Sequence, residues 1–232
     1  MDPVEIKQMA EIEESHWWFR ERRVLIAREL RTLSAGRALD IGAAAGRNTT
    51  VLEEHGWESF ALEYDESGAL LAKDRGIKVM RADATKLPLP DDHFDLAISF
   101  DVLEHIEDDA TVAQEIKRVL KPGGSVLIAV PADPRLWSDH DVAVSHVRRY
   151  TRESLSKLFE EAGFTIEEVW SWNVLLRPAI AWKRKRPANA GSDIESVSPP
   201  LNRLLHGIVA LERYLPVGRM PGVSLMLRAH VG

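Results

Sequence analysis

Cysteine is absent from this chain. Without thiols the protein cannot form disulfides, bind a metal through thiolates or use a cysteine nucleophile, so we expect it in a reducing compartment, with the cytoplasm as the default. Long hydrophobic runs are absent too, since no stretch approaches the roughly 18 apolar residues of a membrane helix. The segment Met1 to Glu14 is acidic and has no apolar centre, so it does not predict a secretory signal.

An excess of basic residues is also missing. The net charge is −6, with 30 Lys and Arg against 36 Asp and Glu. A surface of this sign repels phosphate backbones, so we expect no nucleic-acid partner. The 232 residues are 45% hydrophobic and 28% charged, which is sufficient for one α/β domain with a large core and an appended lobe.

Candidate strands and helices alternate along the chain. Apolar runs predict the strands and amphipathic stretches predict the helices between them. Such alternation is typical of an α/β fold with a doubly wound, mostly parallel sheet, here of seven strands. The expected strands are 37–41, 59–63, 77–81, 94–100, 125–130, 165–173 and 223–230, and the expected helices are 4–33, 47–55, 66–75, 109–120, 151–162 and 201–214.

Four segments follow from this pattern. Residues 1–35 form an N-terminal helical segment, 36–173 the core, 174–222 an insertion and 223–232 the last strand of the core sheet. An insertion of about 50 residues is longer than usual connections, which indicates a functional or partly disordered element. Within it, 188–200 is rich in small and polar residues and resembles a linker.

The most informative stretch is 38–47, with the sequence ALDIGAAAGR. An apolar strand, an acid and a chain of small residues that opens a helix let a cofactor lie against bare backbone, because larger side chains would hold it off. A nucleotide-type cofactor is therefore expected. The spacing of Gly42 and Gly46 does not fit the dinucleotide fingerprint, which disfavours a nicotinamide-dependent oxidoreductase.

Several motifs together resemble the class I S-adenosylmethionine-dependent methyltransferases. They are LDIGAAAG, Glu63 at the end of the second strand, Asp83-Ala84 after the third and SFDVLEHI after the fourth. The resemblance covers roughly residues 37–170 and is nearest to the small-molecule, type 11-like branch that includes ubiquinone-pathway enzymes. It implies a Rossmann-like sheet with an antiparallel last strand, a helical lid at 1–35, S-adenosylmethionine as cofactor and S-adenosylhomocysteine as product.

One residue departs from the family pattern. Ala44 stands where the family most often has its middle glycine. Because a methyl group costs little clearance, we expect cofactor binding to survive, with the turn held at a φ below zero.

The resemblance implies cofactor contacts where the first four strands end. Backbone N–H groups near Gly42 would receive the methionine carboxylate, and Asp40 would orient the turn or take the ammonium. Glu63 would accept the ribose hydroxyls and Asp83 the adenine amino group, although a solvated acid and a turn cap are simpler roles for these two. The predicted cofactor-binding residues are Asp40, Gly42, Ala43, Ala44, Gly46, Glu63, Tyr64, Asp83, Ala84, Ser99, Phe100 and, in the lid, Arg20.

Methyl transfer from a sulfonium is an in-line displacement, so the enzyme must align the nucleophile and remove its proton. His105 is the leading candidate for the catalytic base because a neutral imidazole titrates near working pH, and His146 is its rival. Either histidine could instead anchor a loop. With Glu104 and 139–141 they could form an oxygen–nitrogen metal site, but spacing alone does not support one and no metal is predicted.

Three residues are predicted to bind the acceptor: Arg148, Tyr150 and Trp18. The stretch 146–151 resembles a segment that faces the acceptor in this branch, where an arginine can hold an anionic group. A solvated charge cluster and simple packing of the tryptophan explain these residues equally well. Aromatic and basic residues at 182–186 would suit peripheral contact with an anionic membrane surface, or else form a solvated loop edge.

The sequence thus predicts a methyltransferase for a small-molecule or lipid-like acceptor, methylated at oxygen or carbon. The chain has Ser99-Phe100-Asp101-Val102 in place of the Asn-Pro-Pro-aromatic loop of amino-methylating nucleic-acid enzymes, which disfavours base methylation. The alternative is a protein that binds S-adenosylmethionine without turnover, as a regulator or assembly partner. A pocket that ends at the cofactor would favour that alternative.

Overall fold

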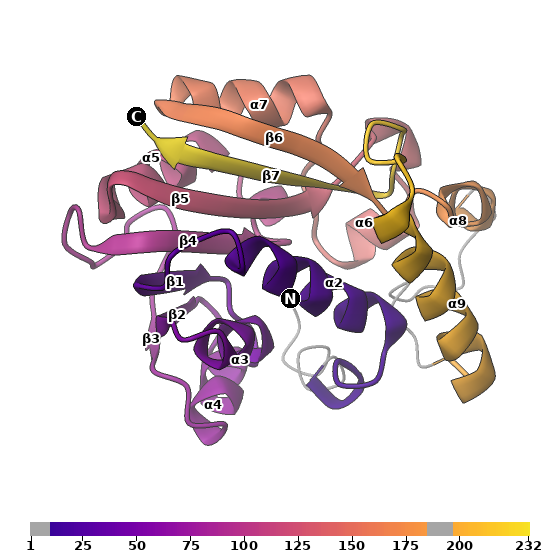
Figure 1. The fold of residues 1–232 in the computed structure, drawn as a ribbon, viewed down its shortest axis with the longest axis horizontal. Helices are drawn as coiled ribbons and strands as arrows, with labels where there is room; N and C mark the ends of the chain where they lie inside the picture. Colours follow the sequence, from indigo (N-terminus) through magenta and orange to yellow (C-terminus); the bar gives the residue numbers. More distant parts are fainter. Residues whose placement is uncertain (1–9, 185–196) are drawn as a thin grey trace.

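The computed structural model describes residues 10–184 and 197–232. Its centre is a seven-stranded sheet with the order β3-β2-β1-β4-β5-β7-β6 (Figure 1). The strands are β1 (Arg37–Ile41), β2 (Glu58–Glu63), β3 (Val79–Arg81), β4 (Phe94–Phe100), β5 (Leu120–Pro131), β6 (Phe164–Trp172) and β7 (Ser224–Val231).

Neighbouring strands from β3 to β5 pair in parallel, whereas β7 is antiparallel to both β5 and β6. The predicted fold class and the antiparallel last strand are therefore confirmed. The strand order reverses between β1 and β4, because the chain leaves β1 toward one edge of the sheet and returns to the other side of it. In open α/β sheets ligands bind at the carboxyl ends of the strands at such a point.

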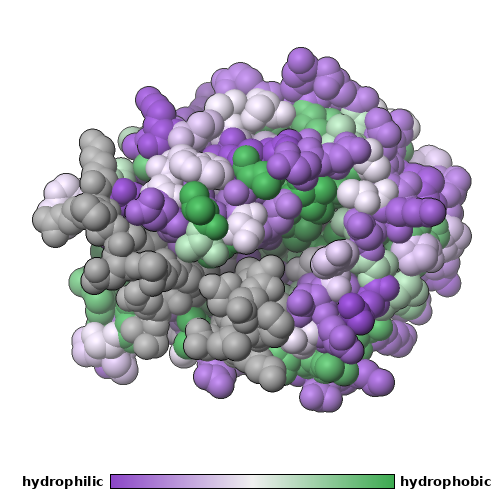
Figure 2. Space-filling view, turned by 180° about the vertical axis from the view of Figure 1, so that it is seen from behind, coloured by the Kyte–Doolittle hydropathy of each residue, from purple (hydrophilic) through white to green (hydrophobic). Residues whose placement is uncertain are grey.

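Helices cover both faces of the sheet. One apolar cluster packs α2 and α3 against one face, and another packs α5 and α7 against the opposite face. Seen from behind, the molecular surface is mostly hydrophilic, with small separate apolar patches (Figure 2). The helices are α2 (Trp17–Leu30), α3 (Arg47–Glu54), α4 (Glu66–Asp74), α5 (Asp109–Val119), α6 (Asp139–Ala143), α7 (Arg152–Glu161), α8 (Arg177–Arg184) and α9 (Pro199–Leu211).

The insertion folds back onto the N-terminal segment. Figure 1 shows α8 and α9 near the carboxyl ends of β4 and β5, with α9 beside the start of α2. The backbone N–H of Trp17 donates to Asn202 Oδ1 at 2.8 Å, and Asn202 Nδ2 donates to the Ser15 carbonyl at 2.7 Å. Leu176 and Val209 pack against the Trp17 ring. Two segments far apart in sequence are thus fastened together.

Several predicted boundaries differ from the structure. The helix expected over 4–33 begins outside the described residues, and α2 starts only at Trp17, with His16 accepting from a backbone N–H at its cap. The strand expected from 125 begins at Leu120, which pairs with Phe94, and Gly123 at φ 75 allows the chain to continue through this irregular register. Most of the predicted linker 188–200 lies outside the described residues.

None of the helices in the two described ranges is long and apolar enough to cross a membrane. Of the predicted membrane-contact segment 182–186, the structure describes the residues up to Arg184. Trp182 in this segment is exposed.

Candidate functional site

A cavity of about 1000 Å³ opens at the carboxyl ends of the parallel strands. This volume is at the upper end of the range for ligand pockets. Its wall is formed by the loops after β1, β2, β3 and β4, by the start of α2, by the segment after α6, and by α8 and α9. Residues that represent these parts are Gly42, Glu63, Asp83, Phe100, Trp18, His146, Ile180 and Leu205.

Asp40 lies beneath the loop after β1 and does not belong to the cavity wall. Its side chain is 1% exposed and accepts a 2.6 Å hydrogen bond from Thr49 Oγ1 in α3. Burial raises the pKa of Asp40 to about 6, against the effect of the Thr49 hydrogen bond. The geometry therefore fits the predicted role of orienting the turn rather than direct contact with an ammonium group.

The turn itself corrects one prediction. Ala44 has a φ of +47°, not the negative φ expected from its side chain. Its N–H donates to Glu63 Oε2 at 2.7 Å, and this charge-assisted hydrogen bond holds the left-handed conformation that glycine adopts more readily. Gly46 at φ 81 lies where a Cβ would come within 2.8 Å of a side-chain atom of Ile77, between α4 and β3, and within 3.3 Å of Ala72 in α4, so both the space and the backbone conformation favour glycine there.

Two acids, Glu63 at the end of β2 and Asp83 after β3, line the cavity. Glu63 accepts from Ala44 N–H and, through Oε1, from Asp65 N–H at 2.8 Å, which ties the two loops together. Asp83 uses Oδ1 for both hydrogen bonds from Thr85, which hold its pKa below the ordinary value. Each carboxylate keeps acceptor capacity for a ligand, since a carboxylate offers about four lone-pair sites.

The predicted cofactor residues divide into two groups. The structure brings eight of the twelve to the wall, namely Gly42, Ala43, Ala44, Glu63, Tyr64, Asp83, Ala84 and Phe100, whereas it leaves Asp40, Gly46, Ser99 and Arg20 out of it.

Arg22, which was not among the predicted cofactor-binding residues, lies in the wall where Arg20 was expected. It donates to Asp101 Oδ2 at 2.6 Å, and its guanidinium lies 4.6 Å from the centroid of the Trp18 ring. Because α2 packs on the sheet through Leu25 and Ile26, the helix turns Arg22 inward and leaves Arg20 exposed. The sequence offered a signal for this: Arg22 lies three and four residues before Leu25 and Ile26, so it shares their face of the helix.

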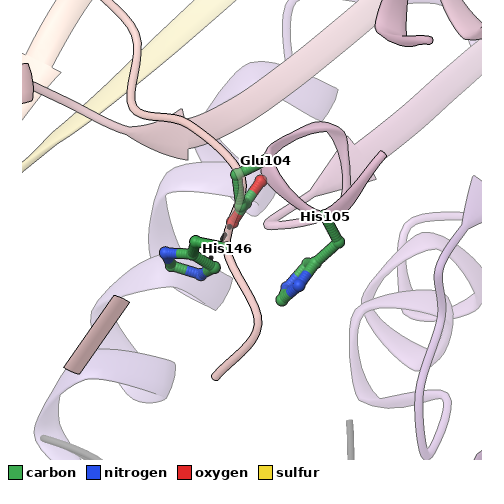
Figure 3. Close-up of side chains that lie close together, drawn as sticks. All are labelled: Glu104, His105 and His146. Carbon is green, nitrogen blue, oxygen red and sulfur yellow. Dashed lines mark ion pairs between the residues drawn. The ribbon is translucent and has the colours of Figure 1, made fainter. Parts of the chain in front are cut away.

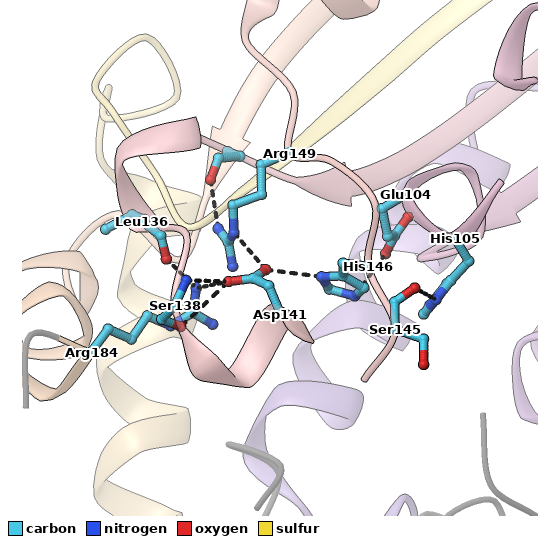
Figure 4. A network of polar contacts seen from close by, with 10 residues as sticks. Glu104, His105, Leu136, Ser138, Asp141, Ser145, His146, Arg149 and Arg184 are labelled. Atoms are coloured by element: carbon cyan, nitrogen blue, oxygen red, sulfur yellow. Dashed lines mark hydrogen bonds and ion pairs between the residues drawn. The ribbon is translucent and has the colours of Figure 1, made fainter. Parts of the chain in front are cut away.

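His146 is held in a polar network at the far end of the cavity (Figure 4). Its Nδ1 lies 2.9 Å from Asp141 Oδ1, and the same oxygen accepts from Arg149 Nε at 2.7 Å. Burial alone would raise the pKa of Asp141, but the hydrogen bond from His146 and the charge of Arg149 hold this pKa well below its usual value. His146 thus faces the cavity with an orientation set by a buried carboxylate.

His105 lies beside His146, with their ring centroids 4.8 Å apart. Its Nδ1 lies 3.2 Å from the Ser145 carbonyl oxygen. Burial, and then the neighbouring His146, lower the pKa of His105 to about 4, so it is neutral at physiological pH. Figure 3 shows the Glu104 side chain pointing toward the same place as the two imidazoles.

The predicted acceptor residues are only partly brought together. Trp18 lies in the wall and packs on Trp172 at 5.3 Å between ring centroids. Arg148 points away and pairs with Asp109 at 2.7 Å, and the Tyr150 hydroxyl donates to the same carboxylate at 2.7 Å. Of these two neighbouring arginines, Arg149 rather than Arg148 lies in the wall.

Comparison with known proteins agrees with this geometry. The model of a methyltransferase domain family matches residues 17–169. A probable S-adenosylmethionine-dependent methyltransferase of Mycolicibacterium smegmatis is 28% identical over 67% of this chain and 62% of its own length. The demethylmenaquinone methyltransferase of Clavibacter sepedonicus is 29% identical over 85% of this chain and 80% of its own. The chain thus spans about three fifths of the mycobacterial relative.

Solved structures show the same fold. A methyltransferase from Thermotoga maritima, described as a possible histamine N-methyltransferase, superimposes with a TM-score of 0.64 at 21% identity, over 99% of this chain and 96% of its own. An enzyme from Archaeoglobus fulgidus gives 0.62 at 20% identity, over 90% and 94%. With the loop after β1, the acids after β2 and β3 and the matched domain in agreement, this chain belongs to the class I S-adenosylmethionine-dependent methyltransferases, and S-adenosylmethionine is its cofactor.

Proposed function

We propose that this enzyme methylates an apolar small molecule at a hydroxyl oxygen or an acidic carbon. The observation that carries the proposal is a single cavity whose wall runs from the loop after β1, past His105 and His146, to the apolar side chains of α8 and α9. A pocket that served cofactor binding alone would end at the cofactor, whereas this one has room and chemistry beyond it.

The cofactor end of the cavity fits S-adenosylmethionine. Glu63 would accept the ribose hydroxyls, and Asp83 Oδ2 would accept from the adenine amino group because Oδ1 is engaged by Thr85. The Arg22–Asp101 pair presents one charge of each sign, which suits the carboxylate and ammonium of the methionine part. When bound, the cofactor supplies an electrophilic methyl group.

The acceptor end combines an apolar wall with polar groups, which include His105, His146, Arg149, Lys183 and Arg184. Leu176, Ile180, Leu201 and Leu205 line it, together with the Trp18 ring. Such a wall favours a molecule whose body is hydrocarbon or aromatic, because each apolar side chain loses contact with water when the ligand covers it. Relatives named as demethylmenaquinone and 2-methyl-6-phytyl-1,4-hydroquinone methyltransferases support an acceptor of this class.

The two histidines would stand at the reacting atom of the acceptor. A neutral imidazole can accept a proton, and the lowered pKa keeps His105 neutral, although it also makes this ring a weaker base than an ordinary histidine. His146 is aligned by Asp141, much as a base is oriented by an adjacent carboxylate in other enzymes. Arg149, buried beside them, would favour an acceptor that carries or develops negative charge.

Calorimetry and a transfer assay test the proposal in two steps. The purified protein is titrated in parallel with S-adenosylmethionine, S-adenosylhomocysteine and NAD, and we expect the first two to bind and NAD to be silent. Radiolabelled methyl transfer is then measured with a panel of hydroquinones, phenols and polar amines. Transfer to the apolar hydroxyl compounds supports the proposal, preferential transfer to polar amines contradicts it, and binding without transfer to any compound favours the non-catalytic alternative.

A further inference from the structure

We propose that Glu104, His105 and His146 form a binding site for one divalent first-row transition-metal ion, with open positions that face the acceptor end of the cavity. One ligand atom from each of the three side chains lies within 4.8 Å of the others. All three residues line the cavity, so an ion among them would be reached by a bound acceptor. Neither the family resemblance nor the relatives assign a metal here.

The first argument is an unsatisfied carboxylate. Glu104 is 0% exposed, and neither of its carboxylate oxygens has a hydrogen-bond partner among the described residues. His146 Nε2 is 3.8 Å from Glu104 Oε1, which is beyond hydrogen-bond distance. A buried carboxylate without a partner is unfavourable, whereas one that is paired or bound to a metal is not. We therefore expect a cation to bind next to the Glu104 carboxylate.

The second argument is the orientation of both imidazoles. The Nδ1 atom of His146 faces Asp141, and the Nδ1 atom of His105 faces the Ser145 carbonyl. An acceptor at each Nδ1 places the proton on that nitrogen and leaves the Nε2 lone pair for a ligand. Histidines that bind metals nearly always donate their second N–H to a carboxylate or a backbone carbonyl in this way.

The ligand set favours a transition metal over Mg²⁺ or Ca²⁺. Two imidazoles and one carboxylate suit Zn²⁺, Fe²⁺ or Mn²⁺, whereas Mg²⁺ and Ca²⁺ prefer oxygen ligands alone. Metal–ligand bonds of about 2.0–2.2 Å place ligand atoms no more than about 4.4 Å apart. The present spread of 4.8 Å would close with small side-chain rotations, and Asp101 is already engaged by Arg22, so solvent or acceptor would complete the coordination.

The chemical role of the ion rests on the proposed function, whereas its binding does not. With the ion bound, Nε2 of both histidines serves as a metal ligand and no longer acts as a base, in place of the proton acceptance proposed for the ion-free site. An acceptor hydroxyl at an open position would then give up its proton to solvent, and at lower pH than a free hydroxyl, because a bound cation stabilises the oxyanion. The freed oxygen lone pair then forms the new bond to the methyl carbon as the carbon–sulfur bond of the sulfonium breaks, with its electrons remaining on sulfur. Atoms and charges balance without a further reactant.

Metal binding is tested on chelator-treated full-length protein. Zn²⁺ and Mn²⁺ are titrated by calorimetry, and metal content is measured after desalting, for the wild type, Glu104→Gln and the control His93→Ala. His93 lies at the amino end of β4 and does not line the cavity. We expect one ion per chain in the wild type and His93→Ala. Glu104→Gln should bind about 100-fold more weakly or worse, beyond the 10–100-fold cost of losing an outer-shell partner.

Two further measurements distinguish loss of the metal site from misfolding and from loss of cofactor binding. Circular dichroism and S-adenosylmethionine titration of each variant report folding and the cofactor site, neither of which needs the ion. If Glu104→Gln binds the cofactor normally yet loses the metal, the proposal holds. No uptake of either ion by the wild type, or wild-type affinity in Glu104→Gln, overturns it. Failure of the cofactor titration in the wild type would instead overturn the proposed function and leave the metal result standing.

Discussion

Asp40 provides a test of the electrostatics beneath the loop after β1. Burial raises the pKa of this carboxyl from 3.8 to about 6, despite the Thr49 hydrogen bond and the charge of Arg22, and the Glu63 carboxylate raises it further. Because the folded state then holds the proton more tightly than the unfolded chain, the contribution of Asp40 to the free energy of unfolding is fully present below pH 3.8 and is lost as the pH rises through 6. At 1.36 kcal/mol per pH unit, that interval corresponds to roughly 3 kcal/mol.

Substitution Asp40→Asn keeps the shape of the side chain and removes its ionisation. We expect the free energy of unfolding of the variant, relative to the wild type, to rise by about 2–3 kcal/mol between pH 4 and pH 8 and to level off above pH 7. Urea unfolding at stepped pH measures it, and other titrating groups largely cancel in the difference. A difference that stays flat, or that falls with rising pH, would show that Asp40 ionises as readily in the folded protein as in the unfolded chain and would refute the reasoning.

Three further predictions concern the site. Gly46→Ala should destabilise the protein by about 2 kcal/mol or more because its methyl group would meet an isoleucine side chain at 2.8 Å, whereas Gly76→Ala, at nearly the same φ but in open space, should cost about 1 kcal/mol; equal losses in thermal unfolding would contradict this. Glu63→Gln should weaken S-adenosylmethionine binding by about 1–3 kcal/mol in calorimetry, and Glu58→Gln at the exposed start of the same strand should leave it unchanged. His105→Ala should lower methyl transfer about 100-fold with cofactor affinity intact, and a loss of folding instead would make the residue structural.

The cofactor end of the site was largely predictable from sequence, because each contact is local to a strand end. In a parallel sheet the residues after β1, β2 and β3 meet at one edge, which brings Gly42, Glu63 and Asp83 to one cavity wall. The predicted sign of φ at Ala44 was wrong, because the observed conformation depends on a hydrogen bond that the Ala44 N–H donates to Glu63 at the end of β2. Local propensity favours negative φ for alanine, and the tertiary contact outweighs it.

The acceptor end was less predictable because its residues lie in irregular segments. Arg148 and Arg149 are adjacent and chemically identical, yet only Arg149 turns inward, where Asp141 and the Ala132 carbonyl hold it. No periodicity indicates which of two neighbours in a loop faces inward. The meeting of Glu104 with His146 likewise depends on a segment some forty residues away, held where the Val147 N–H donates to the Glu104 carbonyl at 2.7 Å.

The two ends of the cavity are linked through α2. Arg22 on this helix forms an ion pair with Asp101, which follows β4. The buried residue before it, Glu21, forms an ion pair with Arg213, which follows α9, with 3.1 Å between Oε1 and Nε. Apolar side chains of α8 and α9 line the acceptor end, whereas the loops after β1 and β2 line the cofactor end. A substitution such as Leu205→Ala should therefore change which acceptor is methylated, measured as the ratio of kcat/KM between a large and a small hydroquinone. Calorimetric affinity for S-adenosylmethionine should stay at the wild-type value, and a parallel loss of both would mean that the acceptor wall also holds the cofactor.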